Sequence, residues 1–227
     1  MVQRVAYTKN RIERLIRAAM GEIKSDLIVT QGSLVNVYSG EVIENTEIAV
    51  LDGRICYVGP DASHTRGEAT RVLDARGLYV APGFIDAHTH IGHFCRPYEY
   101  LQAYVARGTT ALMASSDELA TVFGYAGVKL FQEDVAPHPV RVFTLISMVA
   151  PQDPLLCNTA SYSQEEVRRG LADPSILGLG EIVSWLRLTQ GDEEILERIE
   201  MALNQKKIIH GHTAGARDRK LCAVAAA

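Results

Sequence analysis

The chain has 227 residues, of which 47% are hydrophobic and 22% charged, a composition typical of a folded globular protein rather than of a disordered one. Its 23 lysines and arginines stand against 27 acidic residues, so the formal charge at pH 7 is −4. This balance argues against a nucleic-acid or anionic-membrane partner, because neutralising phosphate groups requires clustered basic residues.

Membrane insertion and secretion are not expected either. The longer apolar stretches, such as Leu78 to Ala87, are interrupted by Pro82, Gly83 and Asp86 and are shorter than the ~20 residues of a membrane-spanning helix. Residues 1–20 carry charges throughout and lack the apolar core of a signal peptide. The sequence therefore predicts a cytoplasmic protein.

Residues 1–25 are predicted to contain a leading amphipathic helix. Ile12, Leu15, Ile16 and Ala19 recur at helical spacing, and Gly21 can close the last turn. We expect this apolar stripe to pack on the rest of the protein.

Residues 26–76 are predicted to form a small β domain, an antiparallel sheet or half-sandwich. The dipeptide Asp52-Gly53 is a strong signal for a two-residue hairpin. The expected strands are 26–30, 33–37, 44–51, 54–58 and 71–73.

From residue 77 to residue 227 apolar strands alternate with helical segments. The order predicts a parallel sheet with crossover helices, closing toward a (β/α) barrel with its chemistry at the carboxyl ends of the strands. The expected strands are 78–87, 109–115, 141–148, 176–183 and 207–212, and the expected helices are 98–106, 118–136, 164–172 and 193–204.

The first candidate site residues are His88 and His90, at the end of the first barrel strand. Histidines spaced by two on a strand project from one face and can bind one metal ion. On spacing alone, two half-exposed loop histidines are an equal alternative.

Two later strands end on further candidate ligands. Glu181 is an acid near the end of an apolar strand, where burial is costly unless the carboxylate is paired or bound to metal, and Gly178 and Gly180 are expected to leave room for a ligand. A helix-cap or salt-bridge role for Glu181 is an equal alternative. Of His210 and His212, the first is assigned to packing or support and the second to ligation. Together these side chains predict a divalent transition-metal site.

These segments resemble those of the metal-dependent amidohydrolase superfamily, and within it most resemble the bacterial adenine deaminases. The resemblance covers nearly the whole chain and includes the leading helix and small β domain. Its motifs are Leu78 to His90 with Pro-Gly-Phe-Ile-Asp-Ala-His-Thr-His, Gly108-Thr109-Thr110, Gly178-Leu179-Gly180-Glu181, and Gly211-His212-Thr213-Ala214-Gly215. The implied fold is an α/β, TIM-like amidohydrolase barrel, here partial with about five strands.

The resemblance implies His88 and His90 as ligands of a first metal, Glu181 as a bridging ligand and His212 as a ligand of a second metal. One or two ions of manganese, iron or zinc are compatible with these donors. The implied reaction is hydrolytic deamination of a purine base, adenine to hypoxanthine, by a metal-activated hydroxide with release of ammonia. Another aminated heterocycle or a cyclic amide is the alternative substrate.

Two local departures bear on substrate choice. Gly92 stands where the adenine deaminases carry glutamate, and Ser115 to Glu118 stand in place of Asp-Pro-His-Glu, which leaves Asp117 where the family has histidine. Gly92, Asp117 and Glu118 are therefore assigned to the substrate pocket, although Glu118 could equally be a first-turn acid of the following helix.

The largest departure is length, because barrel strands six to eight of the family have no counterpart before Ala227. A strand-six histidine and a strand-eight aspartate of the family, and the catalytic acid and base, are expected beyond that residue. The chain is interpreted as truncated and its own activity is left open. Open sheet edges favour pairing with another chain, so a homo-oligomer, a complementary chain or a non-catalytic assembly module is the alternative.

Overall fold

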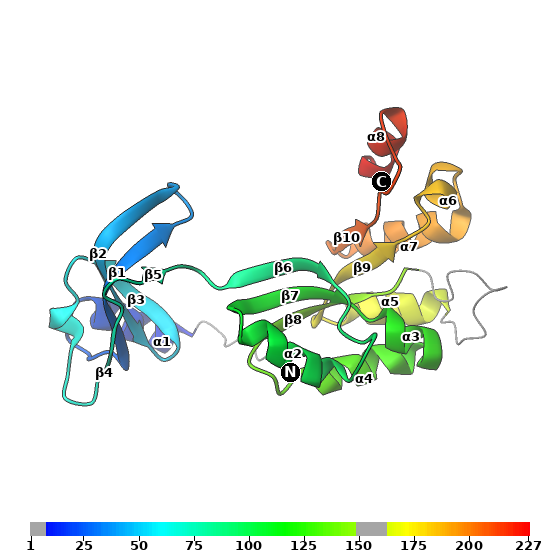
Figure 1. Cartoon of the computed structure of the whole chain (residues 1–227). Helices are drawn as coiled ribbons and strands as arrows, with labels where there is room; N and C mark the ends of the chain where they lie inside the picture. Colours follow the sequence, from blue (N-terminus) through cyan, green and yellow to red (C-terminus); the bar gives the residue numbers. More distant parts are fainter. Residues whose placement is uncertain (1–7, 149–162) are drawn as a thin grey trace. The chain divides into compact units, whose positions relative to one another are not determined.

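A computed structural model describes residues 8–148 and 163–227, and its chain contacts divide into two compact units, Gln3–Pro82 and Gly83–Ala227. Figure 1 shows the elements of both units. Each unit is described by itself below. We propose the domain boundaries that the sequence predicts, at residues 1–25, 26–76 and 77–227.

The first unit contains one five-stranded mixed sheet. Strand β1 (Leu27–Asn36) pairs antiparallel with β2 (Glu41–Leu51), which pairs antiparallel with β3 (Arg54–Gly59). On its other side β1 pairs in parallel with β4 (Arg71–Asp74) and with β5 (Tyr79–Val80). Of the two predicted forms, an antiparallel sheet or a half-sandwich, the antiparallel sheet is corrected to a mixed one, because the chain returns over the short helix η1 (Ser63–Thr65) before the parallel strand β4.

The predicted hairpin at Asp52-Gly53 is present, with Leu51 opposite Arg54 and positive φ angles of 52° and 69° at the two turn residues. Such φ angles are those of the hairpin turns that suit asparagine, aspartate and glycine. The two strands expected at 26–30 and 33–37 are one strand, β1, whose register shifts around Gly32. A Cβ on Gly32 would lie 2.5 Å from Val80, so this position requires glycine.

Helix α1 (Lys9–Ala19) begins after Thr8, whose side chain accepts a hydrogen bond from the Arg11 amide. It is fixed to the hairpin by Arg14, whose guanidinium lies 3.0 Å from the Asp52 carboxylate. Ile12 and Ile16 are 45% and 59% exposed. The apolar stripe expected to pack is thus only partly covered, because the polar contacts turn Arg14 toward the sheet.

The second unit is built on five parallel strands in sequential order. They are β6 (Phe84–Thr89), β7 (Thr109–Ser115), β8 (Arg141–Ile146), β9 (Ile176–Ile182) and β10 (Ile208–Gly211), each paired with the next. The sheet curls as part of a barrel (Figure 1), which confirms the predicted partial (β/α) barrel. The single strand expected at 78–87 is two strands, because β5 belongs to the first sheet and β6 to the second.

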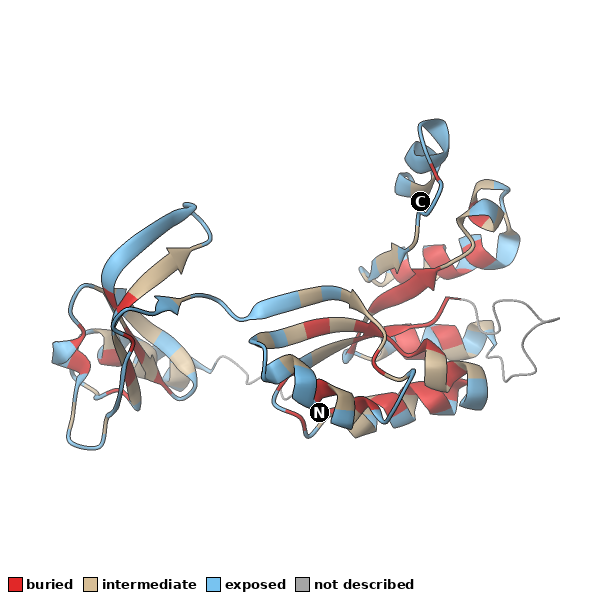
Figure 2. Cartoon of the chain, viewed as in Figure 1, coloured by how far each residue is buried: buried red, intermediate tan, exposed pale blue. Residues whose placement is uncertain are grey.

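Helices connect these strands and cover one face of the sheet. Figure 2 shows the buried residues concentrated where they meet the strands. Leu112, Leu145 and Leu179 of the strands are at most 1% exposed, as is Phe131 of a covering helix. The helices are α2 (Pro97–Val105), α3 (Asp117–Phe123), α4 (Tyr125–Val135), α5 (Gln164–Ala172), α6 (Trp185–Thr189), α7 (Glu193–Asn204) and α8 (Arg219–Ala225).

The helix expected at 118–136 is interrupted at Gly124, which has φ of 60° and ψ of −143° and separates α3 from α4. No residue with a Cβ atom adopts that backbone conformation as readily as glycine does. The helices expected at 164–172 and 193–204 have the predicted bounds. Among the described residues, no helix has the length and apolar character needed to cross a bilayer.

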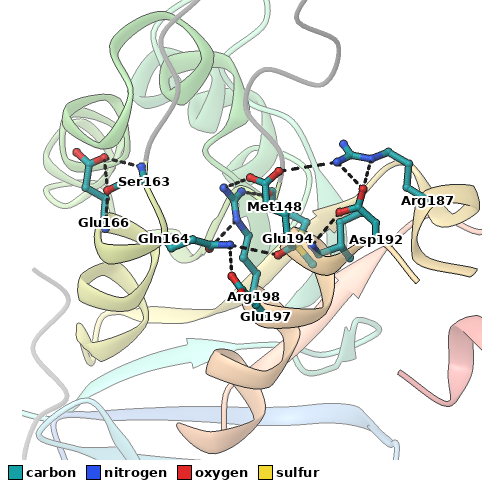
Figure 3. A network of polar contacts seen from close by, with 10 residues as sticks. Met148, Ser163, Gln164, Glu166, Arg187, Asp192, Glu194, Glu197 and Arg198 are labelled. Atoms are coloured by element: carbon teal, nitrogen blue, oxygen red, sulfur yellow. Dashed lines mark hydrogen bonds and ion pairs between the residues drawn. The ribbon is translucent and has the colours of Figure 1, made fainter. Parts of the chain in front are cut away.

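A polar network centred on buried Arg198 joins α5, α7 and the end of the β8 segment (Figure 3). Its guanidinium donates to the Met148 carbonyl, to Gln164 at 3.1 Å and to Glu194 at 2.5 Å. A buried guanidinium is tolerated only when its donors are satisfied, and here two helices and a strand end supply the acceptors.

Candidate metal centre

Four predicted site residues converge at the carboxyl ends of the parallel strands. His88 lies in β6 and His90 directly follows that strand, Glu181 lies in β9, and His212 directly follows β10. Each of the four offers one ligand atom, and these atoms all lie within 4.8 Å of one another. We call these four residues the first cluster.

Glu181 is the centre of the first cluster. Its Oε2 lies 3.3 Å from His88 Nε2 and 2.5 Å from His212 Nε2, and its Oε1 lies 3.3 Å from His90 Nε2. The Glu181 side chain is only 6% exposed, and its Oε2 has no well-formed hydrogen bond. A buried carboxylate ringed by three imidazole nitrogens is a donor set that can hold a divalent metal.

Burial lowers the pKa of two histidines at this site, His88 and His210. The pKa of His88 is lowered from its usual value chiefly by burial, with the Glu181 charge opposing that effect. The pKa of His210 is lowered first by burial and then by His88. Neutral imidazoles retain a lone pair for metal binding, so the lowered pKa values favour ligation.

His210, assigned from the sequence to a supporting role, lies against the first cluster. Its ring stacks on that of His88 with centroids 4.7 Å apart, and its Nδ1 is 3.3 Å from His88 Nδ1. His88 therefore directs Nε2 at Glu181 and Nδ1 at His210. The His210 ring restricts the orientation of the His88 ring, as groups behind metal ligands commonly do.

The end of β6 is held by a second set of contacts. The Asp86 carboxylate accepts from the His88 backbone amide at 3.2 Å and from the Tyr104 hydroxyl at 3.3 Å. The Tyr104 hydroxyl also lies 2.7 Å from that of Thr89. These contacts fix the backbone that carries both histidines, and sequence analysis did not identify Asp86 or Tyr104 in this role.

The glycines before Glu181 serve strand packing. A Cβ on Gly178 would lie 2.2 Å from the Ile208 carbonyl, and one on Gly180 would lie 3.0 Å from His210. Both positions therefore admit the neighbouring strand β10. The expectation that they leave room for a ligand was wrong, because the space beside them is filled by that strand.

A second group of possible ligands, which we call the second cluster, consists of His90, His93 and Glu118. Glu118 Oε1 lies 3.1 Å from His90 Nδ1 and 3.0 Å from His93 Nδ1. Glu118 is in the first turn of α3, so the helix-end and pocket interpretations are compatible. Gly92 lies beside it, since a Cβ there would be 3.3 Å from Glu118 Oε2. Sequence analysis did not identify His93, although it lies three residues after His90.

Asp117, the other predicted pocket residue, is buried at the start of α3 and is 8% exposed. Burial raises its pKa to about 6, against the opposing effect of the Ser147 and Ser115 hydroxyls. The charges of Glu181 and Glu118 act in the same direction as burial and contribute to this raised pKa. Three acidic side chains thus lie close enough to influence one another at the strand ends.

Comparisons with known proteins agree with this geometry. A family model described as "Amidohydrolase family" matches residues 71–164. Among solved structures, a beta-aspartyl dipeptidase from Fervidobacterium islandicum has a TM-score of 0.60 at 17% identity, over 87% of this chain and 53% of that one. A D-aminoacylase has the same TM-score and identity, over 88% of this chain and 48% of that one. The family match, together with the sequence relatives below, supports an amidohydrolase-superfamily protein, and the solved structures share its fold.

Sequence relatives narrow this assignment. An adenine deaminase of Cenarchaeum symbiosum is 43% identical over 216 residues, 95% of this chain and 36% of that protein. Adenine deaminase 3 of Rhizobium meliloti is 38% identical over 203 residues, 88% of this chain and 34% of that protein. The chain is adenine-deaminase-like, and it spans about a third of the length of these curated relatives.

Proposed function

We propose that this chain carries the metal centre of an adenine-deaminase-like hydrolase. The proposed reaction adds water to the amino-bearing ring carbon of adenine and releases ammonia, which gives hypoxanthine. The observation that carries the proposal is the convergence of His88, His90 and His212 on buried Glu181. The similarity to adenine deaminases over most of the chain supports the choice of substrate.

In this proposal His88, His90, Glu181 and His212 are the metal ligands. The fit rests on Glu181, because a 6% exposed carboxylate whose Oε2 lacks a well-formed hydrogen bond requires a cationic partner. Imidazole and carboxylate donors suit manganese, iron and zinc, as one or two ions. When bound, such a metal lowers the pKa of water so that water becomes a nucleophile near neutral pH.

The chain's own residues have further proposed roles. His210 and Asp86 hold His88 in place, so that its Nε2 points at Glu181. Gly92, Asp117 and Glu118 line the proposed purine pocket. Deamination also needs a group that protonates the departing amino group, so that it leaves as ammonia.

A metal analysis of chelator-treated and reloaded protein tests this proposal. We expect about one equivalent of transition metal or more, lost in both His88→Ala and Glu181→Ala. His64→Ala is the matched control, because His64 is exposed and outside both clusters. A folded wild-type protein that retains no metal would overturn the proposal.

Substrate choice needs a separate test, since Gly92 and Asp117 depart from the family pattern. A longer relative with the same two residues, loaded with metal, is assayed against adenine, other aminated heterocycles and cyclic amides. Ammonia release from adenine alone would support adenine deamination. Turnover of a different member of the panel, with adenine inert, would favour the alternative substrate class.

Association with another chain is a second candidate role, favoured by the exposed edge strand β6. Phe84 and Ile85 of that strand are 66% and 72% exposed, and its outer edge has no partner strand among the described residues. Such edges pair readily with additional strands. Light scattering after size-exclusion chromatography tests this role: a dimer or larger species supports it, and a stable monomer contradicts it.

A further inference from the structure

The His90 ring lies between two carboxylates. Its Nε2 is 3.3 Å from Glu181 in the first cluster, and its Nδ1 is 3.1 Å from Glu118 in the second cluster. The two ring nitrogens of an imidazole point in different directions, so one residue can contribute to both clusters. The second cluster is therefore adjacent to the first without sharing its central carboxylate.

Glu118 has more acceptor capacity than the protein satisfies. Its side chain is 10% exposed, its Oε1 faces His90 and His93, and its Oε2 is buried without a hydrogen-bond partner. Two imidazole N–H groups can satisfy Oε1, but they leave Oε2 unpaired. An unpaired carboxylate oxygen in a buried position is costly, and a cation relieves that cost.

The surroundings of Glu118 favour a cation. Asp117 precedes Glu118 at the start of α3 and is 8% exposed, so a second carboxyl group lies buried beside the cluster. Gly92 brings no side chain against Glu118, where even a Cβ would lie 3.3 Å from Oε2. His93 is 53% exposed, which gives an ion an approach from solvent.

We propose that Glu118, His93 and the Nδ1 atom of His90 bind an additional divalent transition metal, separate from the one or two ions proposed for His88, His90, Glu181 and His212. Two imidazoles and one carboxylate form a common three-ligand set for zinc, cobalt, nickel or iron, with water completing the coordination. The site depends on His93, a residue that contributes nothing to the first cluster.

A metal at the second cluster binds more weakly than a metal at the first cluster. One of its ligands is half-exposed, and another is shared with the first cluster, so fewer donors are preorganised. His90 also couples the two ions, because a metal on either nitrogen withdraws electron density from the ring. The proposal rests on the proposed function only through this shared residue.

Titration of metal-free protein with Zn²⁺ by equilibrium dialysis, and with Co²⁺ by visible absorption, tests the proposal. In the wild type we expect a tight class of sites and a weaker class. In His93→Ala the weaker class should lose at least about tenfold in affinity while the tight class remains, and Glu118→Gln should act in the same direction. Phe94→Ala is the control, because this 87% exposed neighbour offers no ligand atom.

A His212→Ala background separates this proposal from the previous one. That variant weakens the first cluster, so its tight class should decline while the His93-dependent class persists. If the wild type shows no tight class of sites, that result contradicts the proposed function but does not contradict the site at the second cluster. A weaker class that is absent in the wild type, or unchanged in His93→Ala, would overturn the second site.

Discussion

The two sheets of this molecule are built differently, and among the described residues the possible metal ligands gather at the strand ends of only one of them. The sheet of residues 3–82 joins hairpins and short parallel pairs over a small buried cluster of Ile28, Ala49 and Ala62. The second sheet, β6 to β10, is wholly parallel, and its inner strands β7, β8 and β9 carry buried residues that pack against helices in two core clusters. Among the described residues, both possible metal clusters belong to the second sheet.

This difference shows what a buried carboxylate site requires. Glu181 is 6% exposed, and its position between His88 and His212 depends on three strands that hold their register. A parallel sheet brings all its carboxyl strand ends to one edge, so ligands distant in sequence meet there. The first sheet offers no comparable edge, since β1, β2 and β3 alternate in direction and only the short strands β4 and β5 run parallel to β1.

The sharpest test of the comparison is a cavity in the core of the second sheet. Phe131→Ala removes a side chain that is 0% exposed and should lower the free energy of unfolding by about 3–5 kcal/mol. Ile55→Ala in the first sheet removes a side chain that is 62% exposed and should change it by less than about 0.5 kcal/mol. Urea unfolding measures both changes, and equal losses would contradict the contrast.

Metal should stabilise one unit selectively. At a free concentration about 100 times its dissociation constant, a metal that binds only the native state adds about 2.7 kcal/mol to stability. Hydrogen exchange followed by mass spectrometry should show added protection in peptides from residues 83–227 and none in peptides from residues 8–82. Glu181→Gln should remove the protection that depends on the tight class of sites. Protection spread evenly over both units would argue against a site confined to the parallel sheet.

The same geometry explains how much of this site could be predicted from the sequence. The two-residue spacing of His88 and His90, and the strand-end positions of Glu181 and His212, were sufficient to predict the cluster of four. The parallel order of the strands was equally predictable, because each apolar run is followed by a helical segment. In these cases a local pattern and a general topological rule determine the contact.

Other features depend on contacts that no local pattern encodes. The Glu118 contact with His93 joins the first turn of α3, after β7, to the segment after β6, and no spacing rule in the sequence predicts it. The sequence predicts space for a ligand beside Gly178 and Gly180, but the neighbouring strand β10 lies against both residues. The run from Leu78 to Ala87 is continuous in hydrophobicity, yet it divides between two sheets at Pro82 and Gly83.

The Arg198 network should have a smaller but clear effect on the second unit. Arg198→Ala removes the donor to the Met148 carbonyl and to Gln164, and should destabilise the protein by about 2 kcal/mol. Arg168→Ala is a suitable control, because its partner Glu165 is 74% exposed and surface ion pairs contribute little. Urea midpoints compare the two, and equal effects would mean that the network does not fasten α7 to α5.

The smallest expected effect is a pH dependence at the opposite end of the same sheet. Burial raises the pKa of Asp173, but hydrogen bonds from Lys129 and Ser175 outweigh it and hold the pKa at about 2, below the usual 3.8. Because the folded pKa lies below the unfolded one, the carboxylate stabilises the fold above about pH 4, and this contribution disappears as the pH falls toward 2. Lys129 is 40% exposed, so solvent screening reduces the contribution to about 1 kcal/mol.

Asp173→Asn and Lys129→Met should therefore lower stability at pH 6 and approach the wild type as the pH falls toward 2. Glu200→Gln, a change at an exposed position of α7, serves as the control and should follow the wild type at every pH measured. Urea unfolding at pH 6, pH 4 and pH 2.5 measures the trend. A difference between Asp173→Asn and the wild type that stays constant across these pH values would mean that Asp173 contributes through packing rather than charge.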